Sequence, residues 1–149
     1  MLRRTHLAIG VALSIYFLPL VTYKLIFVPI VILSSLFPDV DSMHSAVGRR
    51  RIFRPIQLFF EHRGPLHSYT FAIALSLLVA VFYPIAALPF FIGYSFHLLA
   101  DSFTINGIRP FWPSKVSSNG LIRTGGHTER VIFFTFLVID VFLVLMLFA

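Results

Sequence analysis

Long apolar stretches, separated by short polar segments, dominate this chain. Four of them carry almost no charge: residues 7–23, 25–37, 66–99 and 131–149. Stretches of this kind predict helices that enter or cross a membrane. Pro84 divides the third stretch into residues 66–83 and 85–100, because proline favours a turn between two helices. The pattern therefore predicts five helices.

These helices form two hairpins followed by one final crossing. At ~1.5 Å per residue, residues 7–22 and 25–37 would span about 24 Å and about 20 Å, less than a bilayer core of ~30 Å. Pro19 and Pro29 suggest kinks, so this hairpin either crosses twice or re-enters from one side. The predicted fold is all-α: a compact membrane bundle of about five helices, as a single domain over residues 1–149.

Two further segments are expected to lie against the membrane. Residues 50–61 mix arginines with isoleucines and phenylalanines, which predicts an amphipathic helix in the interface. The segment 101–130 has turn signals at Asn106-Gly107 and Asn119-Gly120, and its Trp112 suits the head-group layer.

Composition supports a membrane protein. Hydrophobic residues make up 58% of the 149 residues and charged ones 12%, against roughly 45–50% and about 25% in soluble domains. The absence of cysteine excludes disulfides, thiolate metal sites and cysteine nucleophiles. The start, Met1 to Arg4 before an apolar run, resembles a signal peptide, but no small-residue cleavage site follows. We therefore expect a mature first helix.

The positive charge is distributed unevenly. Five crossings place the N-terminus and the segments 39–65 and 101–130 on one side, with 11 of the 12 lysines and arginines; only Lys24 lies opposite. The positive-inside rule then assigns the loaded side to the cytoplasm and the C-terminus to the outside of the cell membrane. The net charge of +6 thus indicates anionic lipid as a partner, not nucleic acid.

Histidines and carboxylates gather at the predicted helix ends on that same side. The candidate metal ligands are His6, Asp39, Asp41, His62, His67, His97 and Asp101. His97 and Asp101 are four residues apart, so on a helix they can reach one ion. Two carboxylates as close as Asp39 and Asp41 need a neutralising cation or arginine. Each residue alone could be a solvated helix cap, but their convergence favours a metal site.

Without cysteine, any ion must be held by nitrogen and oxygen. Imidazole and carboxylate ligands suit Zn, with Mn or Fe as alternatives, and seven candidates exceed the four ligands of one tetrahedral Zn. We therefore expect two or more divalent ions. Such ions turn bound water into hydroxide and stabilise the oxyanion formed when an ester or phosphoester is hydrolysed.

Other polar residues have open roles. Arg63 could clamp an anionic substrate or simply extend to the membrane surface. Glu129 could act as ligand or base, or could stabilise the positive end of the last helix. Asp140 lies near the middle of the last span, where an isolated charge is unfavourable. Ser68 and Ser102 lack a base partner and are interpreted as helix-end hydroxyls.

The ordered motifs resemble a known family. They are Thr5-His6, Phe37-Pro38-Asp39-Val40-Asp41-Ser42, His62-Arg63-Gly64-Pro65-Leu66-His67-Ser68 and His97-Leu98-Leu99-Ala100-Asp101. Over nearly the whole chain they are similar to the YdjM-like membrane proteins, described as LexA-binding, inner-membrane-associated, metal-dependent hydrolases. The resemblance implies that the seven ligand candidates occupy the family's motif positions, with Glu129 as an addition.

Some aspects of this resemblance carry over less directly. Leu66 stands where the family commonly has threonine, which removes a hydroxyl near the site. No segment of this sequence indicates a LexA-binding surface. A more distant likeness to helical zinc-dependent phospholipase C and nuclease folds implies phosphoesters as substrates.

The leading functional hypothesis is a metal-dependent hydrolase that acts on an ester or phosphoester of a lipid or lipid-linked substrate at the cytoplasmic interface. The alternative is a non-catalytic membrane protein whose metal ties helix ends together in a structural or regulatory role. A transporter would need polar residues through the depth of the membrane, and only Asp140 lies deep.

Overall fold

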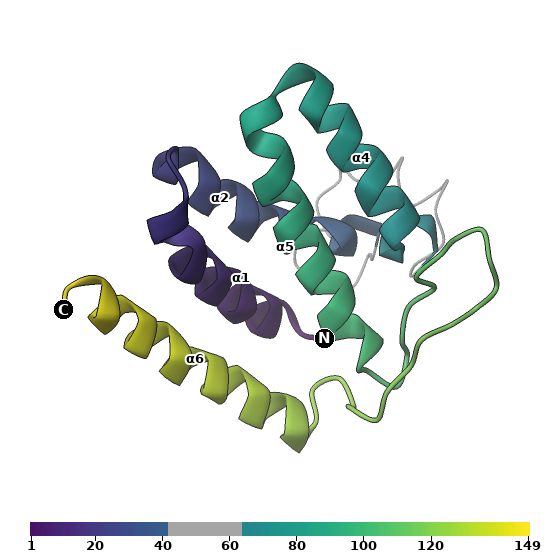
Figure 1. Ribbon diagram of the computed structural model, residues 1–149. Coiled ribbons are helices and arrows are strands. Elements are labelled where there is room, and N and C mark those ends of the chain that lie inside the picture. Colours follow the sequence, from purple (N-terminus) through teal and green to yellow (C-terminus); the bar gives the residue numbers. More distant parts are fainter. Residues whose placement is uncertain (42–63) are drawn as a thin grey trace.

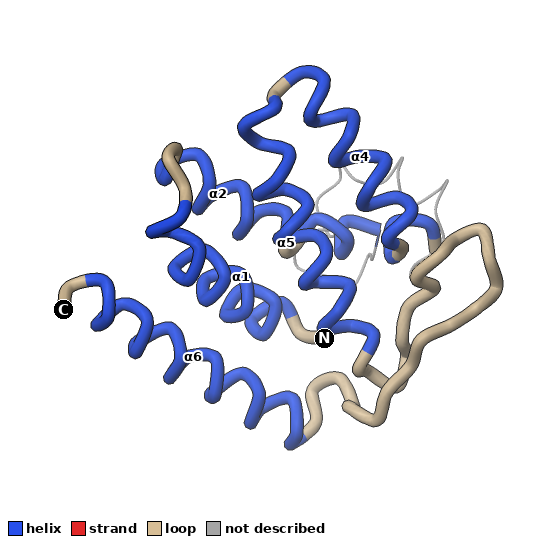
Figure 2. Tube along the Cα trace, in the orientation of Figure 1, coloured by secondary structure: helices blue, strands red, loops and turns tan. Residues whose placement is uncertain are grey.

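The computed structural model describes residues 1–41 and 64–149, which fold into an all-helical bundle (Figure 1). Its helices are α1 (Arg3–Phe17), α2 (Lys24–Ser34), α4 (Tyr69–Phe82), α5 (Pro84–Ser102) and α6 (His127–Leu147). Three 3₁₀ turns join or extend them: Leu18–Leu20, Phe37–Asp41 and Pro65–His67. In the described ranges, extended pairing is limited to isolated bridges in the long α5–α6 loop (Figure 2). The predicted all-α fold is confirmed.

The helix ends differ from the hydropathy pattern by a few residues. α1 begins at Arg3 and α6 at His127, each four residues before its apolar run. Hydropathy marks only the apolar part of a helix, and polar residues such as arginine and glutamate also favour helix. Pro19 lies in the 3₁₀ turn after α1 and so ends that helix instead of kinking it. Pro29 lies inside α2. The predicted amphipathic helix over residues 50–61 falls outside the described residues.

α5 is the central helix, and glycine allows its close contact with α2. α5 packs on α2 and α4, and α1 packs on α2 and α6. A Cβ added at Gly93 would lie 2.1 Å from Ser34 Oγ and 2.3 Å from the Val31 carbonyl oxygen. Only glycine permits this approach, as at many helix contacts in membranes. The contact holds the end of α2 beside the last turns of α5.

α6 lies along α1 at the edge of the bundle (Figure 1). Glu129 is its one buried residue, and large apolar side chains such as Phe134 and Val138 are exposed along it. α5 and α6 are long and apolar enough to cross a membrane, whereas α2 and α4 are shorter apolar helices. Exposed apolar surface of this extent fits a lipid environment. The confirmed fold is therefore that of an all-α membrane protein.

The bundle has one polar end and one apolar end. At the apolar end the two hairpin tips meet, since Tyr23 and Pro84 line the same pocket. At the other end Glu129, at the start of α6, contacts the first residues of the chain. The end of α5 lies there too, because Asp101 contacts His6 of α1. This polar end contains the candidate site.

Candidate metal centre

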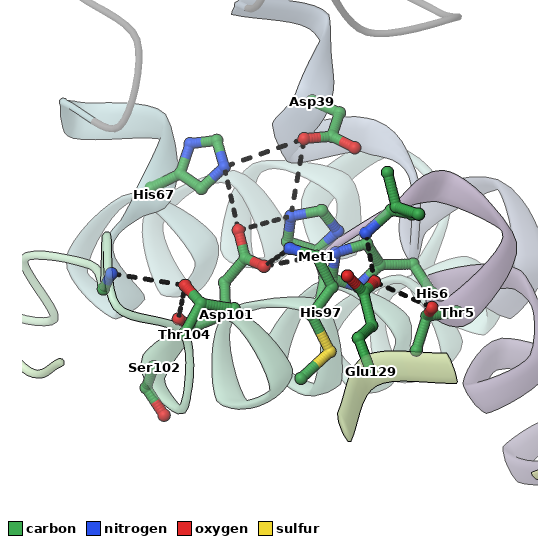
Figure 3. Close-up of polar contacts among 12 residues, drawn as sticks. Met1, Thr5, His6, Asp39, His67, His97, Asp101, Ser102, Thr104 and Glu129 are labelled. Carbon is green, nitrogen blue, oxygen red and sulfur yellow. Dashed lines mark hydrogen bonds and ion pairs between the residues drawn. The ribbon is translucent and has the colours of Figure 1, made fainter. Parts of the chain in front are cut away.

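Five of the seven predicted ligands converge at the polar end of the bundle (Figure 3). His6 comes from the first turn of α1, Asp39 from the 3₁₀ turn after α2, and His67 from the turn before α4. The last two turns of α5 supply His97 and Asp101. Four separate elements therefore contribute to one cluster.

The ring nitrogens of two histidines face the oxygens of two aspartates. His67 Nε2 is 4.0 Å from Asp39 Oδ1 and 3.8 Å from Asp101 Oδ2. His97 Nε2 is 3.9 Å and 3.8 Å from the same two oxygens. These separations are too long for hydrogen bonds but close to the roughly 3.4 Å between two donors on a tetrahedral zinc ion with ~2.1 Å bonds. Their spacing fits ligands arranged around an ion.

His97 is oriented by a backbone carbonyl. Its Nδ1 lies 2.7 Å from the Ser35 carbonyl oxygen at the end of α2. A carbonyl can only accept, so Nδ1 carries the proton and a neutral ring presents a lone pair at Nε2. That Nε2 is buried, and it has no hydrogen-bond partner within residues 1–41 and 64–149. A lone pair that faces two carboxylates is stabilised by a cation, and ligand histidines commonly have such a carbonyl partner.

His6 and Asp101 extend the cluster to a second side. The His6 ring stacks on the His97 ring with centroids 3.8 Å apart, and His6 Nε2 lies 3.3 Å from Asp101 Oδ1. The other oxygen of Asp101 faces His67 and His97. The Met1 amino group also contacts Asp101. Asp101 therefore presents one oxygen to His6 and the Met1 amino group and the other to His67 and His97.

The charge and burial of the cluster also fit a cation. The side chains of His6, His67, His97 and Asp101 are at most 2% exposed, while that of Asp39 is 15% exposed. Burial raises the pKa of the Asp39 carboxyl above its usual range, although the nearby His6 and His67 act to lower it. The carboxylates of Asp39 and Asp101 bring two negative charges into this cluster, and the Met1 amino group contacts one of them. A divalent ion held by both carboxylates would offset the remaining charge that the described residues carry. The residues present therefore fit a Zn-type donor set.

Glu129 lies beside the cluster in a different environment. Its Oε1 accepts hydrogen bonds from the Leu2 backbone N–H (2.5 Å) and the Thr5 hydroxyl (2.9 Å). Its Oε2 accepts one from the Gly125 backbone N–H (2.5 Å). Through these bonds the carboxylate ties the start of α6 to the turn of α1 that carries His6. The geometry therefore favours a positioning role for Glu129.

The other candidates lie outside the cluster or beyond the described residues. His62 and Arg63 fall outside those residues, and Asp41 ends a 3₁₀ turn without a described side chain. Ser68 is confirmed as a helix cap, because its hydroxyl accepts from the Phe71 backbone N–H at 3.2 Å. Ser102 donates to the Leu99 carbonyl, as expected of a helix-end hydroxyl.

Two contacts of the cluster had no counterpart among the predicted site residues. The carbonyl of Ser35 is a backbone atom, and its role depends on the packing of α2 on α5, so no residue pattern could indicate it. Thr5 belongs to the Thr5-His6 motif, but only the folded chain brings it to Glu129.

Comparison with known proteins identifies the family. All 149 residues match the family model described as YdjM inner membrane protein. This protein belongs to the YdjM family. The Inner membrane protein YdjM of Escherichia coli (strain K12) is 38% identical over 100 residues, which cover 59% of this chain and 50% of the relative. The YdjM protein of Shigella flexneri matches to the same extent.

A relative from Bacillus subtilis is also similar. The Uncharacterized protein YvsG of Bacillus subtilis (strain 168) is 27% identical over 104 residues, covering 66% of this chain and 65% of that protein. The matched region spans half the length of the two YdjM relatives. No solved structure matches the chain. The resemblance seen in the sequence motifs is thus confirmed at the level of the YdjM family and its inner-membrane character.

Proposed function

We propose that this YdjM-family protein is a membrane-embedded, metal-dependent hydrolase. The substrate class is an ester or phosphoester of a lipid or lipid-linked molecule, reached from the cytoplasmic interface. The observation that supports this proposal most directly is the orientation of His97, whose buried Nε2 faces Asp39 and Asp101 while its Nδ1 is bound to a carbonyl.

The side chains have distinct roles in this proposal. His67, His97, Asp39 and Asp101 would hold a first divalent ion, Zn with Mn or Fe as alternatives. His6 and Asp101 would be the ligands for a second ion. Asp39 is the most exposed of the five, so substrate and water approach from its side. Divalent ions bound there would supply an acidic water and a positive charge for the developing oxyanion.

Glu129 acts as a positioning residue in this proposal. Its hydrogen bonds with Leu2 and Thr5 hold the first turn of α1, and its bond with Gly125 holds the loop before α6. His6 follows Thr5 directly. Asp41, His62 and Arg63 remain proposed contributors, the first two as ligands and Arg63 as an anion clamp. Asp41 lies two residues after Asp39, and His62 and Arg63 lie within five residues before His67.

The decisive experiment combines elemental analysis with a hydrolysis assay. Protein purified in detergent without chelators is expected to contain at least one equivalent of divalent metal. It should also hydrolyse a fluorogenic ester or bis(p-nitrophenyl) phosphate, and His97→Ala should abolish both properties. Ser102→Ala, at an exposed position on the same helix, is the matched control. Wild-type protein without metal would overturn the proposal.

A second candidate function rests on the burial of the same cluster. Four of the five converging side chains are essentially inaccessible, as expected of a structural site with no open coordination position. In that case the metal would only tie together α1, the end of α5 and the 3₁₀ turns that follow α2 and precede α4. Full metal content with no turnover of either probe, and a large loss of thermal stability on chelation, would favour this alternative.

A further inference from the structure

An apolar pocket of about 310 Å³ lies between α1, α5 and α6. All of its lining residues are apolar, among them Met1, Ile9, Phe96, Ala100, Ile132 and Phe136. Its size falls in the range of ligand pockets, roughly 300–1,000 Å³. Apolar cavities exclude water, and leaving one empty is unfavourable. The pocket is therefore suited to a hydrocarbon group.

The pocket adjoins the candidate metal centre. Ala100 lines the pocket, and the next residue, Asp101, belongs to the cluster. One turn earlier, Phe96 lines the pocket and His97 belongs to the cluster. Consecutive helix residues point about 100° apart, so the pocket and the cluster lie on neighbouring faces of α5. The Met1 side chain lines the pocket while its amino group contacts Asp101. A group in the pocket would thus lie next to the ligands.

From the level of the cluster, the pocket extends along α6 away from the polar end. Glu129, Ile132 and Phe136 lie on one face of this helix, with spacings of three and four residues. Glu129 contacts Thr5 at the level of the cluster, and Phe136 lies about 10 Å further along the helix axis at ~1.5 Å per residue. Ile9 lines the same pocket one turn beyond His6 on α1. One end of the apolar pocket therefore lies at the level of the cluster, and the other lies further along α1 and α6, away from it.

The surroundings of the pocket indicate where its occupant comes from. α6 is long and apolar enough to cross a membrane, and its apolar stretch contains no buried residue. The exterior of the helix that forms one wall is therefore covered by lipid. Hydrocarbon chains are the molecules present at high concentration at this surface. Such a chain can enter laterally, without passing through water.

We propose that this pocket binds a hydrocarbon chain of the lipid substrate, while its ester or phosphoester group lies at the His–Asp cluster. The inference rests on the proposed function and specifies its substrate as a lipid with a long acyl or isoprenoid chain. In this arrangement Ile132 and Phe136 contact the chain, and Met1 lies where chain and head group join.

Photocrosslinking tests the pocket without relying on turnover. The probe is phosphatidylglycerol with a diazirine on its acyl chain, incorporated with the purified protein into nanodiscs, and labelled residues are mapped by mass spectrometry. Labelling is expected to concentrate on pocket residues such as Phe96 and Ile132. Ile132→Trp, which fills the pocket, should lower it several-fold without loss of bound metal. Val138→Trp, at an exposed position of α6, is the matched control.

A second variant covers the possibility that tryptophan disturbs the fold. Phe136→Ala enlarges the pocket, so labelling should persist and move deeper. Uniform labelling of all exposed apolar faces, equal effects of the two tryptophan variants, or crosslinks to a second copy at Ile132 would overturn the pocket assignment. His97→Ala should leave the labelling unchanged. If the pocket is labelled but the protein shows no turnover, the proposed hydrolase function is wrong and the lipid pocket stands. If Ile132→Trp leaves turnover unchanged, the lipid pocket is wrong and the hydrolase function stands.

Discussion

At the scale of single residues, His97 has its two ring nitrogens in opposite environments. Nδ1 donates to the Ser35 carbonyl, and Nε2 faces the carboxylates of Asp39 and Asp101. A neutral imidazole gains nothing from acceptors at both nitrogens, whereas a cation between Nε2 and the carboxylates satisfies all of them. This asymmetry makes the cluster a candidate site and not a set of independent helix caps.

Asp101 is the residue whose loss should affect the cluster most widely, because its two oxygens face different histidines. For Asp101→Asn we expect bound metal to fall from stoichiometric to near zero, since the amide removes the charge shared by both sides. Inductively coupled plasma mass spectrometry of purified protein measures this. Asp101→Asn protein that keeps its full metal content would show that the aspartate serves only as a helix-end partner of His6.

Glu129→Gln separates positioning from direct metal binding. In this variant the side-chain NH₂ group would face the Gly125 N–H, where the carboxylate oxygen now accepts a hydrogen bond. The Gly125 N–H would lose its acceptor, which costs about 1–3 kcal/mol of folding free energy. We expect lower thermal stability with bound metal retained. Thr128→Ala, an exposed neighbour, is the control. Complete loss of metal together with unchanged stability would instead identify Glu129 as a ligand.

At the scale of helices, the site depends on how closely α2 approaches α5. Gly93 has no room for a Cβ against Ser34 and Val31. Ser35, the residue that caps α2, supplies the carbonyl that orients His97. A small residue near the middle of α5 thus fixes a ligand one turn away. Helix packing and site geometry are coupled through this contact.

Gly93→Ala should therefore disturb both stability and the site. The added methyl group overlaps Ser34 Oγ, so we expect destabilisation of about 1–3 kcal/mol and weaker metal retention during dialysis against a chelator. Thermal melting and elemental analysis measure the two effects. Ser102→Ala, also on α5, should change neither. A Gly93→Ala protein with wild-type stability would indicate that the two helices can separate without cost.

Asp140 is the one acidic residue near the middle of α6, and its Oδ1 is buried without a hydrogen-bond partner in the described part of the chain. An acidic residue at the centre of a membrane helix is unfavourable by up to about 3 kcal/mol. We expect Asp140→Leu to raise the melting temperature in detergent and to leave bound metal unchanged. A lower melting temperature or altered oligomeric state would reveal a partner for this carboxyl.

At the scale of the whole molecule, the bundle places all converging ligands at one end and both hairpin tips at the other. Eleven of the 12 lysines and arginines belong to segments on the ligand side of the predicted topology. Together with membership of an inner membrane protein family, this favours a cytoplasmic site with an outward C-terminus.

The absence of native cysteine allows a direct test of this orientation. A single cysteine can replace Ser117, in the α5–α6 loop, or Tyr83, at a hairpin tip. Both residues are exposed. In intact spheroplasts a membrane-impermeant maleimide should label the Tyr83→Cys variant and leave the Ser117→Cys variant unlabelled until the cells are lysed. The reverse labelling pattern would place the cluster outside the cytoplasm.

The sequence by itself determined the all-α fold, the five helices within a few residues of their ends, and the ligand candidates His6, Asp39, His67, His97 and Asp101. Hydropathy and proline positions carry that information because they act locally along the chain. Only the tertiary structure decided which candidates meet, that Ser35 orients His97, and that an apolar pocket adjoins Asp101. These features depend on the distance between helices, which is set by contacts such as Gly93 with Ser34 that no local pattern specifies.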